Sequence, residues 1–348
     1  MKPRCFGTAV SAFALGLVFS FASLADAKDR LVFEPAEGTA NGKHIVLISG
    51  DEEYRTEESC PMLGKILSQH HGFKCTVLFA IDRETDGINP YQIDNIPGTD
   101  ALLDADLMVI ATRWRVLPDE QLDPILEHIQ AGKPIIAYRT ATHAFKSGNY
   151  GGYDWANFGI NVVGENWHSH HGKHKVEGGR GVIVEDNANH PVLNDVADIY
   201  TPSDIYGVVN LDESTATVLL RGMVLQHLDP AAPPVDAKND PMMPLAWLKP
   251  YQAPSGKQGQ CLGTTAGAAV DFRSEDLRRM IVNACYFLCD MEVPKSADVS
   301  FVDPYVPSFY GFVDSKTYRD RDLRVEEFEL GSSATLVTPK GTFEAATK

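Results

Sequence analysis

Four apolar segments, each of the length of a single strand, restrict the fold of this chain more than any other feature of its sequence. They lie at 44–49, 73–80, 106–112 and 134–138. Amphipathic helix patterns at 57–70 and 118–131 follow the first and the third of them. Strands that are apolar on both faces are typical of a parallel sheet that helices cover on both sides. The sequence therefore predicts an α/β fold with a mostly parallel central sheet.

The rest of the chain is less regular. Residues 146–180 are rich in Gly, His and aromatic residues, which is typical of a long loop. Short strands are expected at 181–185, 216–221 and 259–263, and an amphipathic helix at 275–289. We expect one domain over 43–292, an N-terminal linker over 28–42, and a C-terminal extension over 293–348 whose last part is disordered.

The first 27 residues have the pattern of a cleavable secretory signal. The basic start MKPR precedes an uncharged segment at 5–24, and Ala25 and Ala27 are the small residues that a signal peptidase requires. A membrane anchor is the alternative, but three charged residues follow Ala27 at once. We therefore expect cleavage after Ala27, a periplasmic or secreted protein, and no membrane association afterwards.

The net charge of −16 argues against one class of partner. An acidic surface repels phosphate backbones, so nucleic acid is not expected as a ligand. The sequence also lacks a G-x-S-x-G nucleophile motif and a Gly-rich phosphate-binding loop. It gives no indication of the oligomeric state.

Polar residues follow three of the predicted strands where ligands of an open parallel sheet bind, outside the carboxyl ends. The alternative is a set of ordinary loop charges that pair with one another, but three such loops together favour a site. The residues are Asp51, Glu52, Glu53, Tyr54 and Arg55 after the first strand, Arg113 and Trp114 after the third, and Arg139, Thr140 and His143 after the fourth.

A histidine-rich segment at 167–174, with the sequence WHSHHGKH, is the second candidate site. Neutral imidazole is a common metal ligand, so a divalent metal is the one cofactor that the sequence suggests. The spacing is not that of HExxH and no cysteine stands nearby, so any carboxylate ligand would come from elsewhere in the fold. The alternative is a polar loop that lines a pocket. The residues concerned are His168, His170, His171 and His174.

The segment Gly132–Phe145 resembles the strand and sharp turn that carry the nucleophilic cysteine of class I glutamine amidotransferases. Arg139 stands at the cysteine position, so the chain resembles the ThuA-like (trehalose-utilisation) branch of that superfamily, which lacks this cysteine. Three further segments resemble this branch: Asn189–Leu193, Ser203–Tyr206 and Met243–Lys249. Gly263–Gly267 stands where the branch usually has a Gly-His pair, and here Gly267 replaces the histidine.

This resemblance implies a flavodoxin-like, doubly wound fold and a role in carbohydrate utilisation, on a sugar or a 3-keto glycoside. It implies no glutamine amidotransferase activity, because a guanidinium cannot replace a thiolate nucleophile. It also adds Asp204 and Tyr206 to the candidate binding residues.

Taken together, the sequence predicts an exported protein with a small carbohydrate ligand. Glu52 or Glu53, with His143, would be the acid–base pair of a lyase or hydrolase. A non-catalytic sugar-binding or assembly module and a metal-dependent hydrolase using the His segment are the alternatives. Substrate-binding residues would be Asp51, Tyr54, Arg55, Arg113, Trp114, Arg139, Thr140, Trp167, Asp204 and Tyr206.

Overall fold

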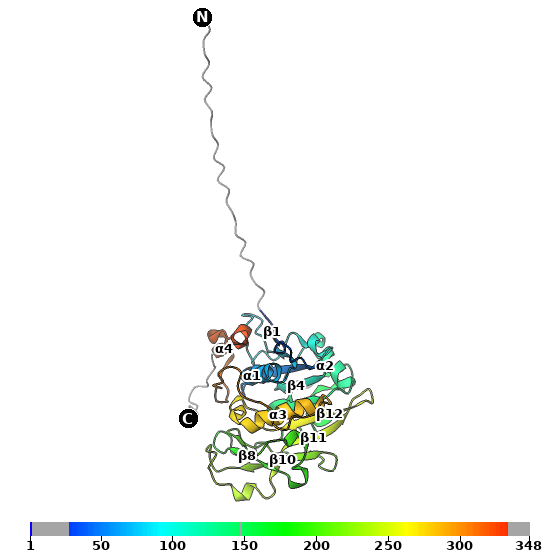
Figure 1. Cartoon of the computed structure of the whole chain (residues 1–348), viewed down its shortest axis with the longest axis vertical. Helices are drawn as coiled ribbons and strands as arrows, with labels where there is room; N and C mark the ends of the chain where they lie inside the picture. The colour runs from blue at the N-terminus through cyan, green and yellow to red at the C-terminus, as the bar shows by residue number, and fades with distance from the viewer. Residues whose placement is uncertain (2–27, 147, 333–348) are drawn as a thin grey trace.

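A ten-stranded sheet forms the centre of the molecule in the computed structural model (Figure 1). The structure describes residue 1 and residues 28–146 and 148–332, so the predicted signal segment after Met1 and the end of the predicted extension lie outside the described residues. The strand order is β1-β3-β2-β4-β5-β12-β11-β10-β8-β9. The strands are β1 (Arg30–Phe33), β2 (His44–Gly50), β3 (Lys74–Leu78), β4 (Leu107–Thr112), β5 (Ile135–Tyr138), β8 (Gly179–Ile183), β9 (Ile199–Thr201), β10 (Thr217–Val224), β11 (Met243–Gln252) and β12 (Gln258–Thr264).

Five of these strands are parallel and give the fold its class. β3, β2, β4, β5 and β12 pair in parallel, and in chain order this arrangement reads second, first, third, fourth, fifth. That order is the flavodoxin-like one, with its switch point between β2 and β4. The predicted α/β, flavodoxin-like fold with a mostly parallel core is therefore confirmed.

Helices cover both faces of the parallel core, as the doubly apolar strands predict. Successive side chains of a strand point to opposite faces of the sheet. Ile45 and Leu47 of β2 belong to the core beneath α1 (Thr56–Gln69) and α3 (Glu275–Leu288). Val46 and Ile48 belong to the core beneath α2 (Asp119–Gln130) on the other face.

An antiparallel extension, which the sequence pattern did not predict as such, continues the sheet beyond β12. β11, β10, β8 and β9 pair antiparallel in that order and form the lower part of the molecule in Figure 1. A separate two-stranded ribbon joins β6 (Asn149–Tyr150) to β7 (Tyr153–Asp154). The sheet is thus half parallel and half antiparallel.

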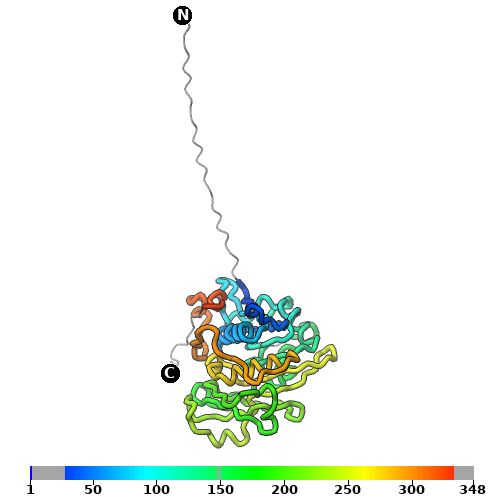
Figure 2. The backbone as a smooth tube through the Cα atoms, viewed as in Figure 1, coloured from blue at the N-terminus to red at the C-terminus, as the bar shows by residue number. Residues whose placement is uncertain are grey.

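Over their described residues, 28–42 and 293–332, both segments that flank the predicted domain belong to the folded body. The segment expected as a linker contains β1, which pairs antiparallel with β3 and buries Leu31 and Phe33. After α3 the chain returns to the N-terminal half, as the orange and red tube in Figure 2 shows, and forms α4 (Ser315–Arg321). Alternating apolar residues in the first case and buried aromatic residues in the second explain why both segments pack.

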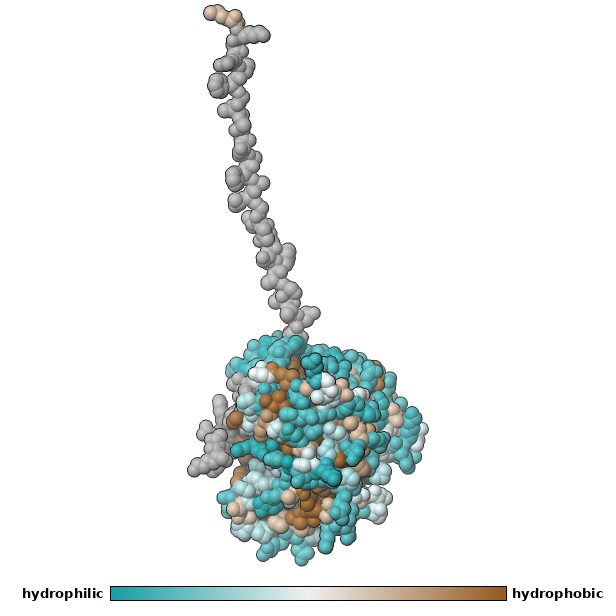
Figure 3. All heavy atoms as spheres, viewed as in Figure 1, coloured by the Kyte–Doolittle hydropathy of each residue, from teal (hydrophilic) through white to brown (hydrophobic). Residues whose placement is uncertain are grey.

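Hydrophilic residues cover most of the face shown in Figure 3, with small hydrophobic areas between them. Within residues 28–146 and 148–332, no helix combines the length and the apolar character that crossing a bilayer requires.

Candidate functional site

The loops after β2, β4 and β5 meet at the carboxyl edge of the parallel strands, and each contains a non-glycine residue with positive φ. The φ angles are 59° for Arg55, 50° for Trp114 and 51° for Arg139. A left-handed conformation is unfavourable for a residue with a Cβ, by about 1–2 kcal/mol. The contacts of these side chains must therefore hold three turns at this edge in place.

Arg139 is buried at the sharp turn where β5 passes into the 3-10 helix η2 (Arg139–His143). Its guanidinium carbon lies 4.3 Å from the ring centre of Tyr54 and 3.9 Å from that of Tyr206. Its Nη1 donates to the carbonyl oxygens of Asp204 at 2.7 Å and Thr265 at 2.8 Å. Because the side chain is 0% exposed, Arg139 positions its neighbours and does not present its charge to a ligand.

Asp204 connects Arg139 to the histidine segment. Its Oδ1 accepts from Arg139 Nη2 at 3.2 Å and lies 3.0 Å from His174 Nδ1, and its Oδ2 lies 2.6 Å from His170 Nδ1. The other ring nitrogen of His174, Nε2, lies 3.0 Å from Glu53 Oε1. Two imidazoles and two carboxylates therefore converge from the loop after β2, the His segment and the loop after β9.

The negative charge of Asp204 and a positive charge on His174 stabilise each other. Burial alone would raise the pKa of Asp204, but the hydrogen bonds with His170 and His174 and the Arg139 charge lower it below its usual range. Burial opposes the charged form of His174, yet Asp204 and Glu53 raise its pKa. The carboxylate of Asp204 is thus ionised, and positive charge is favoured between the two carboxylates.

Backbone hydrogen bonds fix the His segment beside Asp204. The Gly207 N–H donates to the Ser169 carbonyl at 2.8 Å, and the His171 N–H donates to the Ile205 carbonyl at 2.9 Å. The side chain of His171 then points to the Lys238 carbonyl, 2.6 Å from its Nε2. The structure therefore brings His170 and His174 together, whereas His171 faces another loop and His168 is exposed at the surface.

Asp51 shapes the loop after β2 from inside the protein. Its Oδ1 accepts from the backbone N–H of Glu53 at 2.7 Å and of Tyr54 at 2.9 Å, and Thr140 donates to its Oδ2. Burial, together with the charge of Glu52, raises the pKa of Asp51 to about 6. Asp51 and Thr140 are thus internal supports of the site.

Glu52 is held by two arginines from the loop after β4. Arg113 binds its Oε1, and Arg115 Nη2 donates to its Oε2 at 2.7 Å. Both carboxylate oxygens are therefore occupied by guanidinium groups, so Glu52 is not placed as a free base. Arg55 likewise serves the backbone, donating to the carbonyls of Glu52 and Gly311.

A row of aromatic rings borders the histidine pair. Ring centres are 4.8 Å apart for Trp114 and His143, 5.5 Å for His143 and Trp167, and 5.9 Å for Trp167 and His170. Burial and the nearby positive groups, Arg113 first, lower the pKa of His143 well below its usual value, so this imidazole is neutral. Trp167 is 38% exposed, so part of its surface is accessible from solvent.

The C-terminal extension contributes to this site, which was not predicted from the sequence. The ring of Tyr310 stacks on Tyr54 with centres 5.2 Å apart and lies 5.3 Å from His174. Phe312 lies under the guanidinium of Arg113 at 5.0 Å. The aromatic sequence Phe309-Tyr310-Gly311-Phe312 in an otherwise irregular region was the available signal.

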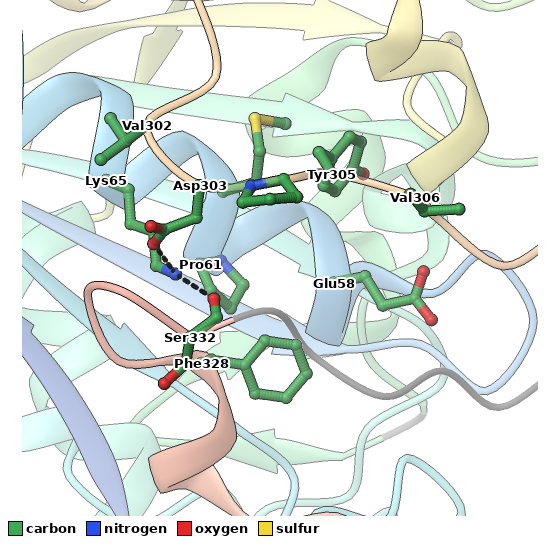
Figure 4. Close-up of a pocket in the computed structure, with 11 residues that line it drawn as sticks. Glu58, Pro61, Lys65, Val302, Asp303, Tyr305, Val306, Phe328 and Ser332 are labelled. Atoms are coloured by element: carbon green, nitrogen blue, oxygen red, sulfur yellow. Dashed lines mark hydrogen bonds and ion pairs between the residues drawn. The ribbon is translucent and has the colours of Figure 1, made fainter.

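A separate small hollow of about 40 Å³ lies between α1 and the C-terminal extension. Figure 4 shows Lys65 pointing towards Asp303 and Ser332, and its Nζ donates to these residues at 2.6 Å and 3.1 Å. The side chains around it are Pro61, Met62, Val302, Tyr305 and Phe328, with Glu58 at one end. None of the candidate site residues lines this hollow.

The solved structures that are similar to this chain include two proteins described as ThuA-like. A protein from Bacteroides uniformis ATCC 8492 described as ThuA-like is 13% identical, with a TM-score of 0.46 over 73% of this chain and 93% of that one. A second, from Parabacteroides merdae ATCC 43184 and also described as ThuA-like, is 15% identical, with a TM-score of 0.46 over 77% and 94% of the two chains. No protein-family model and no curated protein sequence matches the chain. At these TM-scores the fold assignment rests on the strand order itself.

Proposed function

We propose that this chain is an exported ThuA-like protein that binds a carbohydrate at the carboxyl edge of its sheet. The observation that carries the proposal is the exposed indole of Trp167, which lies between His143 and His170 in the aromatic row. A flat aromatic surface beside convergent polar groups suits a sugar ring, which has an apolar face and a polar circumference.

The polar groups next to Trp167 match the hydroxyls of a mono- or disaccharide or of its 3-keto form. His170 and His174 are about one third exposed, and Arg113 is one fifth exposed in its side chain. Imidazole and guanidinium groups donate hydrogen bonds, and the carboxylate of Glu53 accepts them. The motifs that resemble the ThuA-like branch are the second support, since two of them contribute Arg139 and Asp204 to this region.

A lyase or hydrolase step on the bound sugar is the second candidate function. Glu53 favours it, because its carboxylate is next to the histidine pair and, among the residues that the structure describes, no arginine pairs with it as Arg113 and Arg115 pair with Glu52. Such reactions need proton donors and acceptors within hydrogen-bonding reach of the substrate.

Binding is tested by calorimetric titration with mono- and disaccharides and their 3-keto forms. We expect Trp167→Ala to weaken the binding of a recognised sugar by about tenfold, equivalent to about 1.4 kcal/mol. Leu103→Ala is the matched control, because Leu103 is an exposed apolar residue (50%) that precedes β4 at the opposite edge of the sheet. Equal affinities of the two variants for every recognised sugar would exclude this edge as the binding site.

A further inference from the structure

We propose that His170, His174 and Asp204 bind one divalent transition-metal ion. One nitrogen of each imidazole and one carboxylate oxygen lie within 4.8 Å of one another. The Nδ1 atoms of both histidines face the same carboxylate, at 2.6 Å and 3.0 Å. The proposal does not depend on the identity of the sugar.

The distances fit replacement of the two Nδ1–H protons by a metal ion. Metal–nitrogen and metal–oxygen bonds in protein sites are about 2.0–2.2 Å, so neighbouring ligand atoms lie about 3 Å apart. A small outward movement of the partly exposed rings of His170 and His174 would make room for the ion beside Asp204. Asp204 itself needs no movement, because Arg139 already holds its Oδ1.

The surroundings of these residues also have the form expected around a metal. A histidine ligand usually donates its other ring N–H to a carboxylate, which fixes the ring and strengthens the ligand. His174 has this arrangement, with Glu53 Oε1 3.0 Å from its Nε2. A ligating carboxylate is usually hydrogen-bonded as well, and Arg139 provides that contact to Asp204.

The donor set indicates the class of metal. Two imidazole nitrogens and one carboxylate oxygen suit divalent first-row ions such as Zn²⁺, Fe²⁺, Co²⁺ or Mn²⁺ better than Ca²⁺ or Mg²⁺, which prefer oxygen ligands alone. Three protein ligands leave coordination positions open for water or a ligand. The side chains of His170 and His174 are 32% and 28% exposed, so the open positions face solvent beside Trp167.

The His segment supplies its own controls. His168 and His171 lie in the same loop, but His171 faces the Lys238 carbonyl and His168 is at the surface. Substitution of either one removes an imidazole without touching the three proposed ligands. Asp204 is a poor test position, because its removal would leave the buried charge of Arg139 unpaired.

The test is titration of chelator-treated, dialysed protein with Zn²⁺, Co²⁺ or Mn²⁺ alone, followed by calorimetry and, for Co²⁺, by visible absorption. We expect about one equivalent to bind to the wild type and to His168→Ala and His171→Ala, and none to His170→Ala or His174→Ala. Glu53→Gln should bind about 10–100-fold more weakly, because it replaces the carboxylate behind His174 by a neutral amide. Circular dichroism would verify that each variant is folded.

Two results would overturn the metal proposal. One is the absence of stoichiometric binding of any of these ions to the wild type. The other is equal binding by all four histidine variants, which would place the metal elsewhere. Sugar is titrated separately into the metal-free and the metal-loaded protein. A failure of the carbohydrate proposal would therefore leave the metal result intact, and a failure of the metal proposal would leave the sugar result intact.

Discussion

The guanidinium of Arg139 donates from Nη2 to Asp204 Oδ1 over 3.2 Å, and neither side chain is exposed to solvent. This ion pair joins the turn after β5, in the parallel half of the sheet, to the loop after β9, in the antiparallel half. It therefore fixes the carboxylate that both histidines face. The functional edge depends on a buried contact between two halves of the sheet.

The first prediction concerns this contact. Arg139→Ala leaves Asp204 as a buried carboxylate without its arginine, and loss of one partner of a buried pair typically costs about 3–5 kcal/mol. We expect the free energy of unfolding, measured by urea denaturation, to fall by about 3–5 kcal/mol. Lys295→Ala, at an exposed position, should leave it unchanged. An unaltered unfolding midpoint in Arg139→Ala would show that the pair does not support the fold.

The second prediction is that the protein releases no ammonia from glutamine. Arg139 stands at the turn where the amidotransferases have their cysteine, and the five cysteines among the described residues are all buried. Burial raises the pKa of the Cys60 and Cys261 thiols to about 12, which removes the thiolate that a nucleophile requires. These thiols should also resist a disulfide reagent until the protein is unfolded. Glutamine turnover that a Cys→Ala change abolishes would contradict this assignment.

The third prediction is a dependence of stability on pH that originates from Glu58. Burial, with the charge of Glu57 next to it, raises the pKa of Glu58 from 4.5 to about 8. Between these values the folded state binds more protons at Glu58 than the unfolded state does, so its contribution to stability is present below pH 4.5 and is lost as pH rises through 8.

Glu58→Gln keeps an acceptor for the Ser308 N–H, 2.8 Å from Oε2, but removes the ionisation. We expect its free energy of unfolding to fall less steeply between pH 4.5 and pH 8 than that of the wild type. Glu292→Gln, at an exposed position, should follow the wild-type curve. Parallel curves for wild type and Glu58→Gln would refute the raised pKa.

The fourth prediction concerns the C-terminal extension. Tyr310 is buried against Tyr54 and Phe309, with ring centres 5.2 Å and 4.5 Å away. Replacement of a buried aromatic residue by alanine typically costs about 3–5 kcal/mol. We expect Tyr310→Ala to lower the midpoint of thermal unfolding, whereas Val306→Ala, at a residue 61% exposed, should not. Equal midpoints would mean that the extension does not stabilise the domain.

The fifth prediction is export. Ala25 and Ala27 fit a signal-peptidase site, so protein from the native host should begin at Lys28 when its N-terminus is determined by mass spectrometry. Detection of the Met1 start in the membrane fraction would instead support the alternative of an N-terminal anchor.

Much of the fold could be predicted because the residues within each strand or helix already show its apolar pattern. The strands around Ile45 and Val109 and the helix around Ile281 have continuous or periodic apolar patterns, and the structure places them as β2, β4 and α3. β1 was missed because four residues with two buried side chains carry little pattern of their own. Its pairing with β3 is a tertiary contact.

The sequence by itself determined that the chain has a parallel core and which polar residues stand at the carboxyl ends of its strands. Strand and helix periodicity is set by neighbouring residues, so it can be read without knowledge of the rest of the fold. Only the tertiary structure decided what each polar residue does. It enclosed Arg139 between Tyr54 and Tyr206, and it turned His170 and His174, but not His171, towards Asp204. Those roles depend on burial and on contacts between residues far apart in the chain, which no local pattern specifies.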